Sequence, residues 1–392
     1  MRRVNVNAIL SVLRNAGAMT GSNLMAATGL SRATVISVCD ELVGRGWLRE
    51  LDSQRASGGY SKGRPARRFA FDERATYLLG IDAGSTKITV IVANALGESV
   101  ASATVEVRES VTSAEQRAGV LRPAIVDTVA CADIALADVL VASVGVAAPV
   151  TRDGNVLRTQ DFWESFDVRQ SLAEMFGWNV LVENDANLAA LAECWRGVAA
   201  GVSDLVLLLA GERLGAGVME SARLLHGHCG GFGELGYLSH LEGVNSTIGI
   251  GKEVTSLARE AVTGSIPTLL RDLCGGRPEA LTSENVISAA EAGDPTSLRI
   301  LDQVARRMAR VIGSLSTMVN PELVVIAGGV AREANALLAT IGDELSAYTS
   351  TLPPRLAVSS LGDEIVAIGA VKRGLDFLED HAIDLILRPE AL

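Results

Sequence analysis

Apolar strands that end directly in turns of glycine and small polar residues constrain the fold of this chain more than any other feature. Strands of this kind are predicted at residues 78–82, 179–182, 205–209 and 320–330. The last of them ends in Gly328-Gly329 just before the start of a helix. Glycine at such a junction lets the backbone come close to a bound nucleotide or sugar.

The turn after the first strand has the pattern Asp82-x-Gly84-x-Thr86, and a second strand follows it at 87–94. Small residues in such a hairpin expose backbone N–H groups, and its hydroxyls can hydrogen-bond oxygens, so the turn could hold phosphates. Its spacing fits neither the Walker loop nor the Rossmann fingerprint. Alone, the motif is equally compatible with an ordinary hairpin that has an aspartate in its turn.

An acidic turn follows the strand at 179–182. Residues 183–187 read Glu-Asn-Asp-Ala-Asn and lead into a helix over 188–195. A carboxylate at Asp185 could orient a ligand hydroxyl or accept its proton during phosphoryl transfer. It could equally cap the helix, and spacing alone does not decide between these roles.

Charge is distributed unevenly along the chain. The whole sequence carries −11, but residues 1–71 carry +7, so the remainder carries −18. A phosphate backbone attracts the basic end and repels the acidic body, which indicates that nucleic acid binds at one end only. There is no apolar run of about 18 residues and no signal peptide, so we expect a cytoplasmic protein that contacts no membrane. The five cysteines are scattered, which argues against a disulfide framework or a cysteine zinc site.

The basic end has the pattern of a winged helix-turn-helix. We expect three helices and then two strands, at residues 4–14, 23–27, 32–43, 47–51 and 67–71. Thr28-Gly29-Leu30 forms the tight turn between the second and third helices. The Ser-, Gly- and Arg-rich loop between the strands would be the wing. The third helix should turn four residues inward: Val35, Val38, Cys39 and Leu42.

The third helix would enter the major groove by its first turn. Its exposed polar residues, which could contact phosphates or bases, are Ser31, Arg32, Thr34 and Ser37. In the wing, Lys62 and Arg64 of the sequence Lys-Gly-Arg-Pro resemble a minor-groove insert. The alternative is a three-helix domain that binds protein, with the basic loop as a solvated linker.

The order of these segments resembles the ROK family (repressors, open reading frames and kinases) of the actin and sugar-kinase superfamily. The stretches that carry the resemblance are 80–86, 182–187, 227–236 and 320–329. The resemblance implies an N-terminal winged helix-turn-helix followed by a two-lobed α/β fold of the ribonuclease-H-like type. We expect a DNA-binding domain at 1–71 and α/β lobes at 77–195 and 196–392. The C-terminal helix of the second lobe could pack back on the first.

The resemblance also implies where ligands bind. Sugar contacts would come from Asn184, Asp185 and Glu234. In the kinases of the family, Asp185 would be the catalytic base. The residues that would manage the phosphates are Asp82, Gly84, Thr86, Gly328 and Gly329.

Two departures from the family pattern concern the sugar site. Tyr237 stands where members commonly have a histidine that helps to bind sugar and zinc, and it could still offer a hydroxyl to a ligand. The cysteine-rich zinc loop is replaced by residues 241–253, which contain no cysteine, so we expect no zinc there. Nearby residues do not form a familiar metal frame: His226, His228, Cys229 and His240. Glu253 could replace the last sugar-contacting glutamate of the family.

These patterns predict a transcription regulator, in particular a repressor of carbohydrate metabolism, that binds an operator in double-stranded DNA. A sugar or sugar derivative would bind between its lobes, and two-fold symmetry of the operator would call for a homodimer or tetramer. The first alternative is an ATP- and magnesium-dependent sugar kinase. The second is a regulator whose body only dimerises. We expect no cofactor unless the chain is a kinase.

Overall fold

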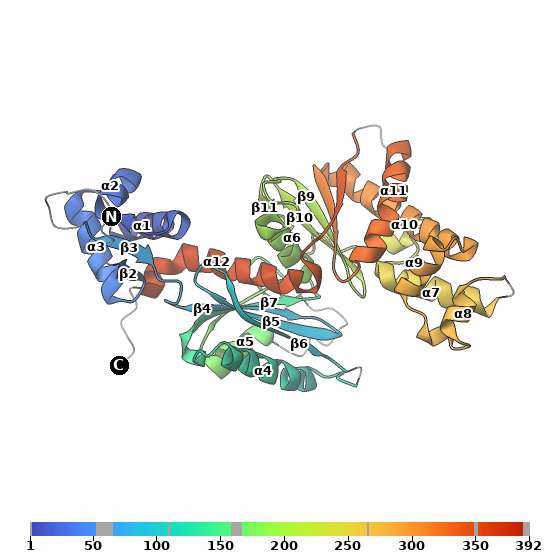
Figure 1. Ribbon diagram of the computed structural model, residues 1–392, viewed down its shortest axis with the longest axis horizontal. Coiled ribbons are helices and arrows are strands. Elements are labelled where there is room, and N and C mark those ends of the chain that lie inside the picture. Colours follow the sequence, from blue (N-terminus) through green and yellow to red (C-terminus); the bar gives the residue numbers. More distant parts are fainter. Residues whose placement is uncertain are drawn as a thin grey trace, which may run out of the picture.

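The computed structural model describes residues 2–51, 66–108, 110–157, 167–264, 266–348 and 352–386. A helical head, a first sheet with its helices and a second sheet with its helices follow one another along the long axis of the molecule (Figure 1).

The head comprises three helices and a small antiparallel sheet of order β1-β3-β2. Its elements are α1 (Arg2–Ala16), β1 (Met19–Thr20), α2 (Gly21–Thr28), α3 (Arg32–Gly44), β2 (Leu48–Leu51) and β3 (Arg68–Phe71). Thr20 and Ser31 cap α2 and α3, because each side chain accepts a hydrogen bond from a backbone N–H in the first turn. Gly29, with a φ of 70°, ends α2 in the left-handed conformation. The predicted helix, glycine turn and helix are thus confirmed.

The apolar core of the head lies between its helices and β3. Four residues of α3 are buried there as their spacing predicts: Val35, Val38, Cys39 and Leu42. Phe69 of β3 is fully buried in the same core.

The first lobe contains a five-stranded sheet of order β6-β5-β4-β7-β8. Its strands are β4 (Tyr77–Ala83), β5 (Lys87–Asn94), β6 (Ser99–Glu106), β7 (Val139–Val146) and β8 (Asn179–Asn184). Strands β4, β7 and β8 are parallel, whereas β5 and β6 are antiparallel to their neighbours. One face is covered by α4 (Ala114–Cys131) and α5 (Val168–Phe176), and η1 (Leu136–Asp138) leads into β7.

The second lobe contains another five-stranded sheet, of order β11-β10-β9-β12-β13. Its strands are β9 (Leu205–Ala210), β10 (Leu214–Glu220), β11 (Arg223–Leu224), β12 (Leu323–Ala327) and β13 (Arg355–Val358). The helices of this lobe are α7 (Ile250–Thr263), α8 (Leu270–Cys274), α9 (Ser283–Glu291), α10 (Pro295–Val319) and α11 (Ala331–Tyr348). Shorter 3-10 turns are η3 (Gly236–His240), η4 (Pro278–Ala280) and η5 (Gly362–Glu364).

Two helices, α6 (Asp185–Arg196) and α12 (Ile365–Ile386), connect the lobes. Leu188 of α6 and Val366 of α12 share an apolar cluster with strands of the second sheet, while α12 also packs on β4 and β7 of the first. A Cβ at Gly80 of β4 would collide with the backbone oxygen of Ala367, so glycine permits the close approach of α12. The last helix therefore returns to the first lobe, as the sequence allowed.

The far end of α12 reaches the head (Figure 1). Leu375 and Leu378 are buried in the same cluster as the core of the head. Arg14 of α1 adds polar contacts, because its guanidinium donates a hydrogen bond of 3.0 Å to Ala95 O and lies 3.4 Å from the Glu379 carboxylate. One helix thus extends from the junction of the lobes to the head.

Candidate functional site

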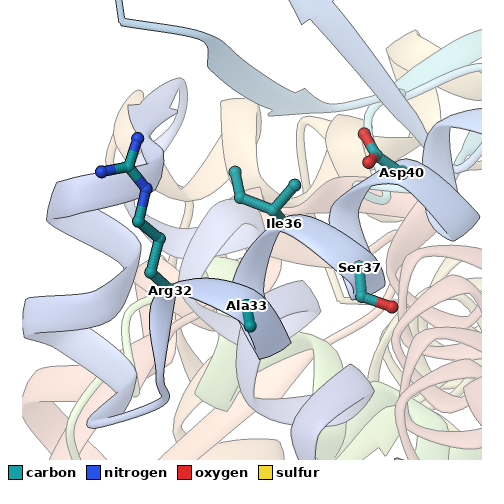
Figure 2. A pocket seen from close by; sticks show the side chains of 5 residues that line it. All are labelled: Arg32, Ala33, Ile36, Ser37 and Asp40. Atoms are coloured by element: carbon teal, nitrogen blue, oxygen red, sulfur yellow. The ribbon is translucent and has the colours of Figure 1, made fainter.

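The exposed side of α3 is the first candidate surface. Arg32, Ala33, Ile36, Ser37 and Asp40 line a shallow depression along this helix (Figure 2). Of the residues predicted to contact DNA, Ser31, Arg32 and Ser37 are exposed and Thr34 is half-buried. The Ser31 and Thr34 hydroxyl oxygens lie 2.9 Å apart, so these two side chains also hold the helix start in place.

Asp40 was not part of the sequence-based prediction, and it adds a negative charge to this surface. Arg67, next to β3, lies 2.7 Å from Asp40 and 2.6 Å from Glu50 of β2. These ion pairs tie α3 to the strands on either side of the predicted wing. Lys62 and Arg64 lie outside the residues that the structure describes.

Asp82 and Asp185 form an acidic pair where the first lobe meets α6. Asp82 is the next-to-last residue of β4 and is 8% exposed, and Asp185 is the first residue of α6. Burial raises the pKa of each carboxyl to about 7. The charge of Asp82 raises the pKa of Asp185 further, and that of Glu234 adds a smaller increase. Three predicted site residues are therefore close enough to interact electrostatically.

Asn184 and not Asp185 caps α6. The Asn184 side chain accepts a hydrogen bond of 3.1 Å from Asn187 N and donates one of 3.1 Å to Ala148 O. Asp185 Oδ1 accepts a hydrogen bond of 2.8 Å from Ala186 N. The start of the helix thus positions the Asp185 carboxylate.

Glu183 and His226 form a pair that sequence reasoning did not select as a site. Glu183 is 5% exposed, and its Oε2 lies 2.8 Å from Nε2 of His226, which follows β11 in the second lobe. Glu183 Oε1 accepts bonds of 2.9 Å from Asn184 N and from Asn187 Nδ2. The pair joins the lobes beside the acidic turn.

The remaining predicted sugar contacts differ in their surroundings. Glu234 is exposed at the surface. Desolvation by its surroundings raises the pKa of its carboxyl, and the charge of Arg213 opposes this shift. Tyr237 is 89% exposed on η3. Glu253, in the first turn of α7, is ion-paired with Arg307 at 3.4 Å. The structure brings Glu234 near Asp185, whereas Glu253 is engaged by a neighbouring helix.

The turn between β4 and β5 is held by α4. Arg117, which is 4% exposed, donates hydrogen bonds to the backbone oxygens of Gly84 and Ser85, and the second of these is 2.9 Å long. Thr86 lies exposed at the edge of this turn.

The Gly328-Gly329 turn faces a carboxylate. A Cβ at Gly329 would collide with Asp363 of η5, and Asp363 forms an ion pair of 2.9 Å with Lys87. Asp363 also raises the pKa of Asp82. The turns predicted to bind phosphate are thus gathered around this ion pair.

The glycine-rich turn between β9 and β10 is also occupied. Its backbone N–H at Leu214 donates to Thr247 O at 2.8 Å, and its oxygen at Glu212 accepts from Gly249 N at 3.0 Å. The Glu212 side chain forms an ion pair with Lys252. Residues 247–249 therefore take up hydrogen-bonding groups that a phosphate would need.

Two further features are absent from the described ranges. No group of three or more His, Cys, Asp or Glu side chains is arranged to hold a metal ion. None of the helices in these ranges combines the length and apolar character that crossing a membrane requires.

The two sheets, the connecting helices and the acidic turn define a two-lobed α/β protein of the actin and sugar-kinase class. Residues 78–372 match the ROK family. The chain belongs to the ROK family.

Known members of the family differ in how much of this chain they match. The xylose repressor of Caldicellulosiruptor bescii is 25% identical, over 95% of this chain and 95% of its own length. The glucokinase of Halalkalibacterium halodurans is 31% identical, over 53% of this chain and 67% of its own length. A solved ROK family transcriptional regulator, homologous to the Escherichia coli MLC protein, covers 98% of each chain with a TM-score of 0.74 and 20% identity. The repressor and regulator thus match the head as well as the lobes.

Proposed function

We propose that this protein is a DNA-binding transcription regulator, a repressor, that responds to a sugar or sugar derivative bound between its lobes. The observation that carries the proposal is a basic head with an exposed helix, α3, joined by one continuous helix to a two-lobed body of the sugar-kinase class. The near full-length similarity to a xylose repressor supports the same function.

The head would bind DNA as a winged helix-turn-helix. In this proposal α3 enters the major groove, with Arg32 and Ser37 at base edges or phosphates and Ser31 and Thr34 at the helix start. Lys62 and Arg64 would follow the minor groove. The Arg67 ion pairs support this geometry, because they fix α3 relative to β2 and so to the base of the wing.

The effector site would be built on the acidic turn. Carboxylate and amide side chains are suited to sugar hydroxyls, which both donate and accept hydrogen bonds. Asp185 and Glu234 would accept such bonds, Asn184 would add an amide, and Tyr237 and Glu253 remain proposed contacts. The electrostatic proximity of Asp185 to Glu234 supports a site shared by both lobes.

Connecting helix α12 offers a path from this site to the head. Near its start, Ser359 donates a hydrogen bond to the Glu193 carboxylate of α6, which has no exposed surface. This bond links the two helices that connect the lobes. At its other end, Glu379 meets Arg14 of the head. Closure of the lobes around a sugar would move α12 and with it the head, and so change the spacing of two heads in a dimer. A homodimer or tetramer on a palindromic operator is part of the proposal.

A sugar kinase is the second candidate, and one observation favours it. The raised pKa of Asp185, about 7, suits a general base that accepts a hydroxyl proton. Asp82, Gly84, Thr86, Gly328 and Gly329 would then bind the phosphates of ATP with magnesium. Against this, Asp363 faces the Gly329 turn and Glu212 lies in the other glycine turn, so that the triphosphate would meet carboxylates.

The test is fluorescence anisotropy of the full chain on the DNA upstream of its own gene, with and without a panel of hexoses, pentoses, N-acetylated sugars and their phosphates. We expect specific binding that one sugar class changes. Specific binding indifferent to every sugar would leave a regulator whose body only dimerises. If the chain binds no DNA specifically and turns over ATP with a sugar, the proposal is wrong and the protein is a sugar kinase.

A further inference from the structure

Arg307 of α10 is a buried cation in the second lobe. It is 4% exposed, and its guanidinium donates hydrogen bonds of 3.3 Å to Ser246 O and 3.0 Å to Ile248 O. The Glu253 carboxylate lies 3.4 Å away and supplies the opposite charge. Burying a guanidinium is costly unless such groups surround it. These contacts compensate for part of its burial, whereas Nε is buried without a hydrogen-bond partner among the described residues.

The two carbonyl partners of Arg307 belong to one loop, residues 241–249, which runs from η3 to α7, and Glu253 lies in the first turn of α7. Arg310, one turn further along α10, packs on Gly243 of this loop and donates a hydrogen bond of 3.4 Å to Glu242 O. Backbone carbonyls and a carboxylate thus converge on arginines from a single helix. This loop occupies the place in the sequence where relatives were expected to have a cysteine-rich zinc loop.

The 241–249 loop in turn contacts the strands beside the proposed effector site. Ile248 forms an isolated antiparallel bridge with Arg213, and Thr247 O accepts a hydrogen bond from Leu214 N. Arg213 interacts with Glu234, one of the proposed sugar contacts. A shift of the loop would therefore move Arg213, whose charge acts on Glu234.

We propose that the Arg307 guanidinium is the cation that orders the 241–249 loop in place of a metal ion, and that the ordered loop holds Arg213 through its bridge to Ile248. The fork of the guanidinium can bond two carbonyls and a carboxylate at fixed angles, which a single ammonium cannot do. The consequence for Glu234 rests on the proposed function, whereas the ordering of the loop does not.

Hydrogen exchange of the full chain, followed by mass spectrometry, tests the ordering without any effector. In Arg307→Met we expect exchange in peptides covering 241–253 to become about tenfold faster, while peptides of β9 and β12 keep their rates. In Arg307→Lys, the exchange rate of these peptides should lie between the rates of Arg307→Met and the wild type. Arg310→Met, which removes one longer bond, is the matched control and should have a smaller effect.

Two further experiments distinguish ordering of the loop by the arginine from ordering by a metal ion. In Arg307→Ala, guanidinium chloride at low millimolar concentration should restore part of the protection, and sodium chloride should not. EDTA should leave the wild-type exchange of 241–253 unchanged. Unchanged exchange in Arg307→Met, or faster exchange of the wild type in EDTA, would overturn the proposal.

If Arg307→Met does not fold, a milder substitution tests the same proposal. Glu253→Gln keeps the shape of the partner and removes its charge, and it should also speed exchange in 241–253. If it does not, the proposal is wrong. A loop ordered by Arg307 in a protein that binds no sugar would contradict the proposed function while leaving this inference intact.

Discussion

His226 Nε2 lies 2.8 Å from Glu183 Oε2, and this contact joins the segment after β11 to the end of β8. The other Glu183 oxygen accepts hydrogen bonds from the backbone of Asn184 and the side chain of Asn187. A second contact supports the first, because a Cβ at Gly230 would collide with Val150 O. The segment that leads to Glu234 is therefore seated on the first lobe beside Asp185.

We expect His226→Leu to destabilise the protein by about 1–3 kcal/mol, because the buried Glu183 carboxylate loses its hydrogen-bond partner in the second lobe. Urea unfolding monitored by circular dichroism measures this change. His228→Leu is the matched control, since His228 is exposed two residues away. Equal stability of the two variants would mean that the pair does not hold the lobes together.

The second prediction concerns pH. Asp82 and Asp185 have a pKa of about 7 in the folded protein, raised mainly by burial. An aspartate in the unfolded chain titrates near about 3.9. Between these values the folded state holds protons that the unfolded state has released. The contribution of these two carboxyls to stability therefore falls as pH rises from about 4 to about 7 and is then constant.

Asp185→Asn removes one of these groups and relieves the repulsion on Asp82. We expect the variant to be more stable than the wild type at pH 8, by about 1–2 kcal/mol, with the gap narrowing as pH falls towards about 4. Thermal unfolding at several pH values measures the gap. Asp127→Asn, at an exposed position of α4, is the control and should show no such trend. A gap that is constant with pH would contradict the raised pKa of Asp185.

Local sequence signals account for the head and for the strands around the acidic turn. A cap at Ser31, a glycine turn at Gly29 and inward residues at helical spacing are enough to predict α2 and α3, because each signal acts within a few residues. Strand β1 is too short, at two residues, to show any alternation. Strand β6 lies at the edge of the sheet and is largely exposed, so it has no continuous apolar run.

Spacing in the sequence indicates only those site contacts whose residues are neighbours in the chain, and the resemblance to the ROK family adds Glu234. Asn184 and Asp185 belong to a recognisable turn, whereas His226 and Glu183 are 43 residues apart and meet only once both lobes are folded. The pairing of Glu253 with Arg307 is likewise a tertiary contact, and no spacing in the sequence reveals it. Asp363 escapes prediction for the same reason, since it reaches the Gly329 turn from the connection to α12.

DNA recognition by α3 gives the third prediction. We expect Arg32→Ala to weaken binding to the upstream DNA by about 1–3 kcal/mol, because its exposed guanidinium would contact a base edge or a phosphate. Anisotropy titrations at two salt concentrations distinguish these roles. Loss of a phosphate contact lowers the number of ions released on DNA binding, and so the slope of log affinity against log salt, by about one. Arg122→Ala, an exposed arginine of α4, is the control. Equal affinity of both variants would exclude Arg32 from the interface.

The last prediction concerns the attachment of the head. Arg14 bonds Ala95 O at 3.0 Å, pairs with Glu379 at 3.4 Å and stacks over the Phe71 ring at 5.4 Å. Burial lowers its pKa, while Glu379 opposes that shift. Arg14→Leu should cost about 1–3 kcal/mol and let the head unfold before the body, so that calorimetry records two transitions in place of one.

In Glu379→Gln, Arg14 keeps its hydrogen bond to Ala95 O, so the loss of stability should be smaller. Asp380→Asn, at the exposed next position of α12, should not change the stability. If α12 transmits lobe closure to the head, Arg14→Leu should also bind DNA with an affinity that an active sugar no longer changes, because the moving helix has lost its polar hold on α1. A variant with two transitions and an intact sugar response would show that the apolar contacts of Leu375 and Leu378 are sufficient for coupling. A single transition at the wild-type temperature would show that Arg14 does not hold the head.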